Sequence, residues 1–414
     1  MTGQPDVFEI SDAELLELDL EQLCGPKPRG CHTQPQTDGG KPEPSDEDND
    51  RTPVKSEPCC SNQETAALTS RKDEHQSINL SPEPGEASGP NPDCTVAKRQ
   101  KQDKRTPMEK FGLTYLSVTH LSRQVWCEQQ VVYGMEMPQI EKLRAELPIV
   151  KAGSSLHLAR ELEVHDIVAV NVTSREDSWA IKLLNLLSAI QVLQTGGIVR
   201  EMPVFGELDG LFLVGIIDEL RYNSKGELEL CEFKTRSQRS FPGAAQRKSH
   251  HLQVRVYKCL FEAMIRGEVD KGILLRHLRL RTEQPFGSEV SEHAEKMGFT
   301  VHTFGDLLDL VLLNLTYSEI PQIDTLMIEY CYQADRSAIG AEAVCFQEEW
   351  LRRELANCFS FWKGQREAEG VDIEEAWKCC SCDFVDICDW RQRKAEELTQ
   401  KYKAIQSRGR PKLH

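Results

Sequence analysis

The sequence predicts an α/β fold, because strand-like and helix-like hydrophobic patterns are mixed along residues 109–395. Apolar runs of strand length, bounded by turn residues, predict the strands 198–205, 211–220, 228–234, 272–280 and 325–332. Longer segments with apolar residues three or four positions apart predict the helices 150–163, 179–193, 252–265, 304–315 and 346–365.

Individual patterns justify these elements in turn. The helix predicted over 179–193 places Ile181, Leu184, Leu187 and Ile190 on one face. The strands predicted over 211–220 and 228–234 are separated by Asn223-Ser-Lys-Gly226, a turn sequence that predicts a hairpin. The helix predicted over 252–265 is the next predicted element after this hairpin.

Residues 1–108 are predicted to form a disordered acidic tail, because 12 of the 20 prolines lie in the first hundred residues and aromatic residues are scarce. Within the tail, Ser11–Leu23 combines a capping box with five leucines, which predicts a short amphipathic helix that docks on a partner or forms only transiently. The basic stretch Lys98–Arg105 indicates a nuclear localisation signal or a solvated linker. A nuclear address is therefore expected, with the cytoplasm left open. Residues 396–414 are expected to form a basic C-terminal tail.

The charge distribution allows a nucleic-acid enzyme despite a net charge of −16. Residues 1–100 contain 9 basic and 20 acidic side chains, so the remaining 314 residues, with 41 and 46, are close to neutral. No apolar run is long enough for a membrane span, and the acidic N-terminus does not resemble a signal peptide. Fifteen cysteines without an export signal indicate a reducing compartment, where clustered cysteines bind metal more often than they form disulfides.

A catalytic constellation is expected around the predicted hairpin. Asp218 follows an apolar strand, and Glu232 and Lys234 lie two positions apart on the next strand, so that their side chains share a face. Two carboxylates can hold a hard divalent cation at a phosphodiester, and an ammonium group can offset the charge that develops at phosphorus. Alternatively, Asp218 starts a turn and Glu232 and Lys234 belong to an ordinary strand edge.

Three further side chains complete the candidate site. Gln253 and Tyr257 lie one helical turn apart, so they can anchor a phosphate or hold Lys234 in place. His157 lies on a predicted helix, where a neutral imidazole can be a third metal ligand. On its own, however, this residue also fits a helix-surface or core histidine. Glu201, two residues before Pro203, is at most an accessory acid.

The order of these motifs carries a family resemblance: Gly153-x-x-x-His157, Gly215-x-x-Asp218, Glu232-x-Lys234 and Gln253-x-x-x-Tyr257. The series resembles the RecB-type branch of the PD-(D/E)XK nucleases. That resemblance implies a mixed central sheet flanked by helices. It also implies that His157, Asp218 and Glu232 bind Mg²⁺ or Mn²⁺ and that Lys234 is the catalytic lysine. The Gln253–Tyr257 motif would support the active site.

The cysteines near the C-terminus suggest a second metal site. Cys379, Cys382 and Cys388 supply three local thiolates, and the fourth ligand is Cys127 from the start of the folded domain or Cys380. One remote cysteine before such a group resembles the 4Fe-4S cluster of iron–sulfur nucleases in the exonuclease V family. The resemblance implies a cluster that joins the N- and C-terminal parts of a nuclease domain over residues 109–395. The remaining cysteines of the domain are predicted to be small core residues: Cys231, Cys259, Cys331, Cys345 and Cys358.

The resemblance implies a Mg²⁺-dependent exonuclease that hydrolyses single-stranded DNA. A role in DNA repair follows from the family together with the expected nuclear address. A monomer is expected, and no membrane partner is expected because no apolar run has the length of a membrane span. Single-strand-binding protein is a candidate partner. Two alternatives stay open: a non-catalytic DNA-binding protein with a structural metal site of four cysteines, and an iron–sulfur redox protein. A group of basic residues near the hairpin can track a DNA backbone or belong to a solvated loop: Arg236, Arg239, Arg247 and Lys248.

Overall fold

The computed structural model describes residues 105–164, 168 and 170–408. The amphipathic segment Ser11–Leu23 and the basic stretch up to Lys104 lie outside the described residues. Within the described residues, no helix combines the length and the apolar character that a bilayer span requires.

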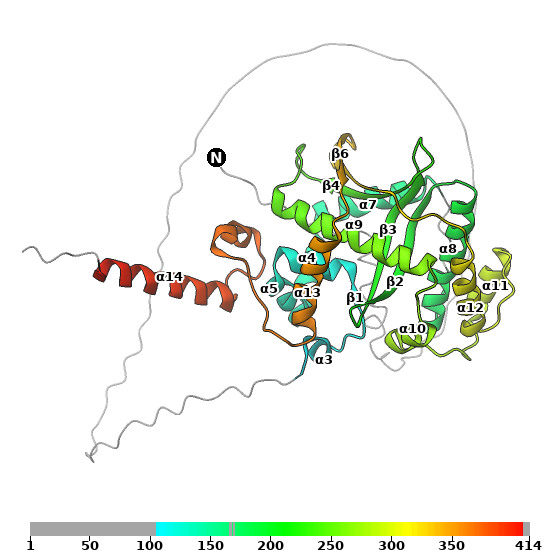
Figure 1. The fold of residues 1–414 in the computed structure, drawn as a ribbon, viewed down its shortest axis with the longest axis horizontal. Helices are drawn as coiled ribbons and strands as arrows, with labels where there is room; N and C mark the ends of the chain where they lie inside the picture. Colours follow the sequence, from blue (N-terminus) through cyan, green and yellow to red (C-terminus); the bar gives the residue numbers. More distant parts are fainter. Residues whose placement is uncertain (1–104, 165–167, 169, 409–414) are drawn as a thin grey trace, which may run out of the picture. The chain divides into compact units, whose positions relative to one another are not determined.

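A six-stranded mixed sheet forms the centre of the fold (Figure 1). Its strands are β1 (Leu116–Ser117), β2 (Val199–Leu208), β3 (Leu211–Tyr222), β4 (Leu228–Arg236), β5 (Thr325–Tyr332) and β6 (Ala338–Val344). The order is β1-β3-β4-β5-β6, and β2 pairs with β3 in addition. The pairs β1–β3 and β4–β5 are parallel, and the other pairs are antiparallel. The expected mixed sheet is therefore confirmed.

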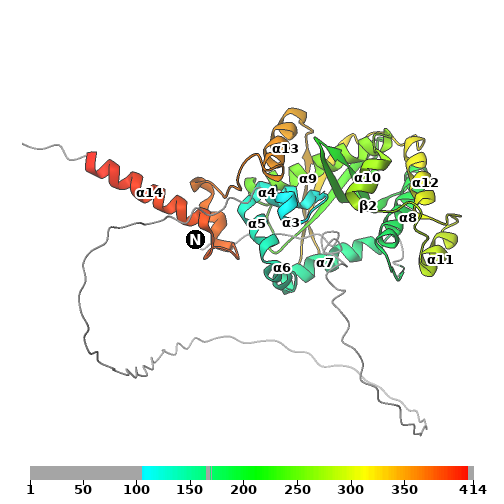
Figure 2. The same cartoon turned by 90° about the horizontal axis from the view of Figure 1, so that it is seen from below.

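Helices lie on both faces of this sheet (Figures 1 and 2). Helix α9 (Ala244–Ile265) crosses one face and contacts β2 to β5, whereas α7 (Pro148–Glu161) packs on β4 from the other side. The other helices are α3 (Pro107–Phe111), α4 (Val118–Trp126), α5 (Glu128–Glu136), α6 (Pro138–Ala145), α8 (Arg175–Gln194), α10 (Lys271–Leu278), α11 (Ser288–Lys296), α12 (Phe304–Thr316), α13 (Glu348–Trp362), the 3₁₀ helix η1 (Ile373–Ser381) and α14 (Asp389–Arg408).

The main core fills the space between the sheet and the helices α8, α9 and α12. Leu184, Phe205, Leu260 and Leu308 are fully buried there. Burial of one such side chain stabilises the fold by about 1.5–3 kcal/mol. The same packing fixes α9 against the sheet, and α9 carries two of the expected site residues.

Most of the predicted elements are present, but the strand predicted over 272–280 is wrong. This segment lies mainly in helix α10, whose N-cap Asp270 accepts a hydrogen bond from the Ile273 N–H at 2.7 Å. Leu274 and Leu278, one helical turn apart, are its buried residues. A short apolar run does not distinguish a strand from a buried helix, and here the cap and the helical spacing prevail.

The predicted hairpin is confirmed, although its candidate catalytic residues lie inside strands and not at strand ends. Asn223 stabilises the turn, because its Oδ1 accepts hydrogen bonds from the backbone N–H groups of Lys225 at 2.9 Å and Glu227 at 3.1 Å. Gly226 adopts the left-handed conformation with φ 78°. Asp218 lies within β3, which continues to Tyr222.

Candidate active site and cysteine cluster

Asp218 lies where β3 and β4 separate. The ladder between these strands ends at the pair Glu219–Cys231, and the same register places Glu232 opposite Asp218. At this step the Asp218 Oδ2 accepts a hydrogen bond from the Phe233 N–H at 2.7 Å. The aspartate carboxylate therefore occupies the gap between the two strands, and a backbone donor fixes its orientation.

Glu201 lies on the other side of Asp218. Arg200 pairs with Glu219 and Met202 pairs with Ile217, so the register places Glu201 opposite Asp218. Its backbone has φ 52°, in the left-handed region that non-glycine residues adopt rarely. Such a conformation persists only where the surrounding structure determines it. The central strand thus presents an aspartate with one glutamate on each side.

His157 completes a group of three possible metal ligands. One ligand atom from each of His157, Glu201 and Asp218 lies within 4.8 Å of the other two. The His157 Nδ1 lies 4.0 Å from the Asp218 Oδ2, and both side chains are buried. The structure therefore makes Glu201 a candidate metal ligand, whereas the sequence predicted at most an accessory role. Its only sequence signal is an acidic residue just before an apolar strand segment.

Burial controls the charge of His157. It lowers the pKa of His157, the Asp218 carboxylate acts in the opposite direction, and Lys234 and Arg160 lower that pKa further. The neutral imidazole that results is the form that binds a metal ion. Gly153, one turn earlier on α7, allows the helix to approach β4, because an added Cβ would lie 2.9 Å from the Thr235 Oγ1.

Glu232 and Lys234 form a buried ion pair on β4. The Lys234 Nζ lies 3.0 Å from the Glu232 Oε1. Lys234 is 4% exposed and Glu232 is 0% exposed. Strand alternation places both side chains on one face of the sheet, as expected. Glu232 lies outside the group of three atoms within 4.8 Å, so its expected role as a metal ligand stays a prediction.

Gln253 and Tyr257 lie on α9, where they bind each other. The Gln253 Nε2 donates a hydrogen bond to the Tyr257 hydroxyl at 3.0 Å, and both residues are buried. The Tyr257 ring packs on Gly215 of β3, where an added Cβ would lie 2.5 Å from the Tyr257 Cε1. The glycine three residues before Asp218 therefore allows α9 to approach the strand that carries the aspartate.

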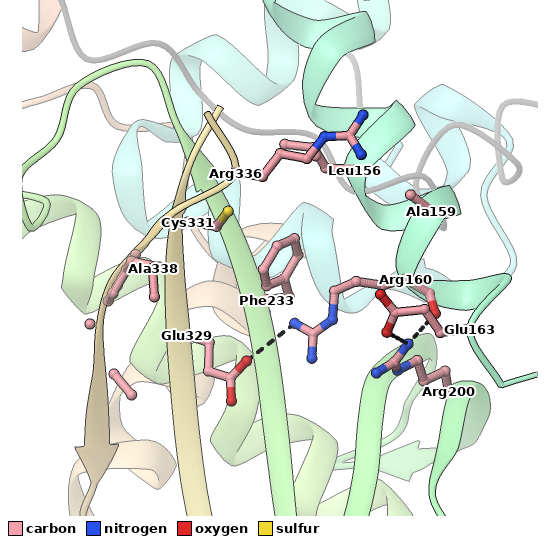
Figure 3. Close-up of a pocket in the computed structure, with 13 residues that line it drawn as sticks. Leu156, Ala159, Arg160, Glu163, Arg200, Phe233, Glu329, Cys331, Arg336 and Ala338 are labelled. Atoms are coloured by element: carbon pink, nitrogen blue, oxygen red, sulfur yellow. Dashed lines mark hydrogen bonds and ion pairs between the residues drawn. The ribbon is translucent and has the colours of Figure 1, made fainter. Parts of the chain in front are cut away.

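A pocket of about 550 Å³ lies beside this site, between α7 and the strands β4, β5 and β6 (Figure 3). Arg160, Arg200 and Glu329 contribute charged groups to its lining, and Phe233 contributes an aromatic wall. The Phe233 ring also contacts the His157 ring at a centroid distance of 5.1 Å. Phe233 therefore contacts both the pocket and the candidate metal ligand His157.

Of the four basic residues considered for DNA binding, Arg236 is used inside the protein. It is 6% exposed, its Nε donates to the Ser240 carbonyl at 2.7 Å, and its Nη1 donates to the Gln246 Oε1 at 3.1 Å. This residue stabilises the loop before α9. Arg239 and Lys248 are exposed, and each has an acidic partner within 4.0 Å: Asp335 and Glu354, respectively.

Of the four predicted cluster ligands, Cys379, Cys382 and Cys388 lie close enough to Cys127 for electrostatic interaction with its thiol. Burial raises the pKa of the Cys127 thiol to about 12, the Gln130 backbone N–H opposes this, and the thiols of Cys382, Cys379 and Cys388 raise it further. Cys380, the alternative fourth ligand, is exposed.

A polar network joins the residue after Cys127 to the segment that precedes η1. Glu128 is 5% exposed and accepts two hydrogen bonds from Arg366, at 2.5 and 2.9 Å. It also accepts one from the Glu369 N–H at 2.7 Å.

The prediction of core cysteines holds for Cys231, Cys331 and Cys358 but is wrong for Cys345, which is exposed.

Comparison with known proteins identifies the family. The family model for "Exonuclease V - a 5' deoxyribonuclease" matches residues 106–230, 223–306 and 300–391. The protein "Exonuclease V" of Danio rerio is 46% identical over 289 residues, which cover 70% of this chain and 73% of the relative. A solved structure described as "Crystal structure of SSO0001" covers 67% of this chain and 86% of its own, with a TM-score of 0.34 and 15% identity, which is too distant to support an argument.

The chain is therefore a deoxyribonuclease, a hydrolase that acts on DNA. It belongs to the exonuclease V family, which implies exonuclease action of the 5′ type. This result confirms the family resemblance and favours the enzyme over the non-catalytic and redox alternatives. The 5′ specificity was not predictable from the sequence motifs.

Proposed function

We propose that the protein is a Mg²⁺- or Mn²⁺-dependent exonuclease of single-stranded DNA. The observation that carries this proposal is the arrangement around Asp218. A central strand places this aspartate between Glu201 and Glu232, and α7 brings His157 to within 4.0 Å of its carboxylate.

The donor set fits a divalent cation. Carboxylate oxygens are the ligands that Mg²⁺ and Mn²⁺ prefer, and one neutral imidazole is compatible with Mn²⁺. His157, Glu201 and Asp218 would hold the ion, with Glu232 as a further candidate ligand. A bound cation would supply polarisation of the scissile phosphate and a lower pKa for an attacking water.

The protein's own groups prepare the site for this chemistry. The Phe233 N–H orients the Asp218 carboxylate, and burial keeps His157 neutral. Glu232 holds Lys234 at 3.0 Å, so that an ammonium group is fixed in advance beside the developing phosphate charge. Gln253 and Tyr257, buried on α9 next to Gly215, support the strand that carries Asp218.

We also propose that Cys127, Cys379, Cys382 and Cys388 hold a 4Fe-4S cluster. Cysteine thiolates are the usual ligands of such clusters. The placement of one remote cysteine before a Cys-x2-Cys-x5-Cys group, which resembles the pattern of iron–sulfur nucleases, supports this proposal. The role of the cluster would be structural, because it would join the start of the domain to its C-terminal segment.

The proposed setting follows from the sequence. The basic stretch up to Arg105 supports a nuclear location, and a nuclear deoxyribonuclease is suited to DNA repair. Single-stranded DNA would be the substrate, and single-strand-binding protein would be a partner that presents it. The protein would act as a monomer.

One assay tests this proposal. The full chain is incubated with single-stranded or double-stranded DNA, labelled at either end, with and without Mg²⁺. Wild-type protein should degrade the single strand only when the metal is present, and the Asp218→Asn variant should be inactive at the same protein concentration. Equal cleavage in the presence of excess chelator would overturn the proposed metal dependence.

A further inference from the structure

Close in sequence to each of the three candidate metal ligands lies a charged residue, and these three charged residues form one ion cluster. Arg160 lies three residues after His157 on α7, and Arg200 directly precedes Glu201 on β2. Glu219 directly follows Asp218 on β3. The side chains of these three neighbours meet one another, so the ion cluster joins the same three elements that supply the ligands.

Glu219 is the centre of this cluster. It is 2% exposed, and its Oε2 accepts hydrogen bonds from the Arg160 Nη2 at 2.9 Å and the Arg200 Nε at 2.7 Å. Its Oε1 accepts a third from the Arg221 Nη1 at 2.6 Å. Burial acts to raise the pKa of Glu219, but the charges of Arg160, Arg200 and Arg221 outweigh it and hold that pKa below its usual range.

The two arginines are also fixed at their outer sides. The Arg160 Nη1 donates to the Glu329 Oε2 at 3.3 Å, and the Arg200 Nη1 donates to the Glu163 Oε2 at 2.8 Å (Figure 3). Arg200 donates in addition to the backbone carbonyl of Arg160. Helix α7 is therefore tied both to β3 and to β2, close to His157.

We propose that Glu219, together with Arg160 and Arg200, positions the metal ligands of the active site. Shared hydrogen bonds to one buried carboxylate set the distance between α7, β2 and β3, and therefore the distances among His157, Glu201 and Asp218. Glu201 has the strongest need for such support, because its φ of 52° is unfavourable for a glutamate. Glu219 itself acts as a positioning residue and does not contact the ion.

The substitution Glu219→Gln tests this inference, which rests on the proposed metal-dependent function. Glutamine keeps the size of the side chain but removes the charge that Arg160 and Arg200 share. Loss of such a supporting group lowers metal affinity by about 10- to 100-fold. Binding of Mn²⁺ to the full chain, measured by titration calorimetry without DNA, should weaken by that factor. At saturating Mn²⁺, DNA degradation by the variant should recover a much larger part of the wild-type rate than it does at limiting Mn²⁺.

Glu229→Gln is the matched control. Glu229 is a carboxylate on the adjacent strand β4 that binds Arg221 at 2.7 Å, but it does not directly adjoin His157, Glu201 or Asp218 in the sequence. Among the described residues, it accepts no hydrogen bond from Arg160 or Arg200. This variant should lose stability to a comparable extent and keep the Mn²⁺ affinity of the wild type. If Glu219→Gln does not fold, Arg200→Gln replaces it, because it breaks the link next to Glu201.

The outcomes separate this inference from the proposed function. If both the Glu219 and the Glu229 variant bound Mn²⁺ as tightly as the wild type, the positioning role would be overturned and the proposed metal site would stand. Equal loss of affinity in both variants would also overturn it, because the effect would then be a general loss of stability. Absence of Mn²⁺ binding in the wild type would overturn the proposed metal-dependent function and this inference with it.

Discussion

Substitution of Gly215 tests whether α9 supports the candidate active site. An alanine Cβ at this position would lie 2.5 Å from the Tyr257 Cε1 and 2.9 Å from the Val118 Cγ2. Ordinary carbon–carbon contacts are about 3.5–4.0 Å, so Tyr257 would have to move by about 1 Å. Tyr257 is 2% exposed and Val118 is fully buried, so neither neighbour has free space to move into.

Overpacking of this kind costs about 1–3 kcal/mol. We therefore expect Gly215→Ala to lower the free energy of unfolding by that amount in denaturant titrations. Activity should fall as well, because displacement of Tyr257 disturbs its hydrogen bond with Gln253 and the strand that carries Asp218.

Gly206→Ala is the control for this change. Gly206 is also buried in the sheet, on the paired strand β2, but an added Cβ would meet only the Leu260 Cδ2, at 3.4 Å. This substitution should have much less effect on stability and activity. If Gly215→Ala were as stable and as active as Gly206→Ala, the close approach of Tyr257 to β3 would be refuted.

Two further predictions concern a cofactor and a buried histidine. Protein purified anaerobically should be brown, and Cys379→Ser should lose the visible absorbance that Cys345→Ser keeps; colourless wild-type protein with stoichiometric zinc would contradict the cluster. His250 is buried, and its burial, followed by the charges of Lys234 and Arg236, places the pKa of this imidazole well below its usual range. Because an unfolded histidine takes up a proton near pH 6.5 and the folded one does not, stability should fall below that pH, by up to about 1.4 kcal/mol per pH unit. His250→Gln can keep the hydrogen bond to Tyr330 and should have a smaller slope in denaturation between pH 6.5 and 5, whereas an unchanged slope would contradict a neutral His250.

The sequence predicted the features that local patterns determine. The hairpin that carries Asp218 and Glu232 was predictable, because apolar runs flank a turn that begins with Asn223 and ends with Gly226. The helix that carries His157 was also predictable, because apolar residues recur three or four positions apart over residues 150–163. Strand alternation then placed Glu232 and Lys234 on one face, as the structure shows.

Features that depend on pairing between distant segments were not predictable. Glu201 joins the candidate metal ligands His157 and Asp218 through the register of β2 on β3 and through its φ of 52°, neither of which a local pattern contains. Strand β6 was missed because its sequence, AIGAEAV, has weak strand propensity, and pairing with β5 determines its conformation. Arg236 was considered for DNA binding because the sequence does not show that its loop folds back onto it.

Direct titration of Mn²⁺ into the full chain tests the central claim most closely, with wild-type protein and the Asp218→Asn variant compared by calorimetry. Asparagine keeps the shape of the side chain but removes the central charge of the group formed with His157 and Glu201. We predict saturable binding to the wild type, with at least tenfold weaker binding to a variant that remains folded. Equal affinity for Mn²⁺ in the two proteins would show that the metal does not bind at Asp218, and would contradict the proposed active site.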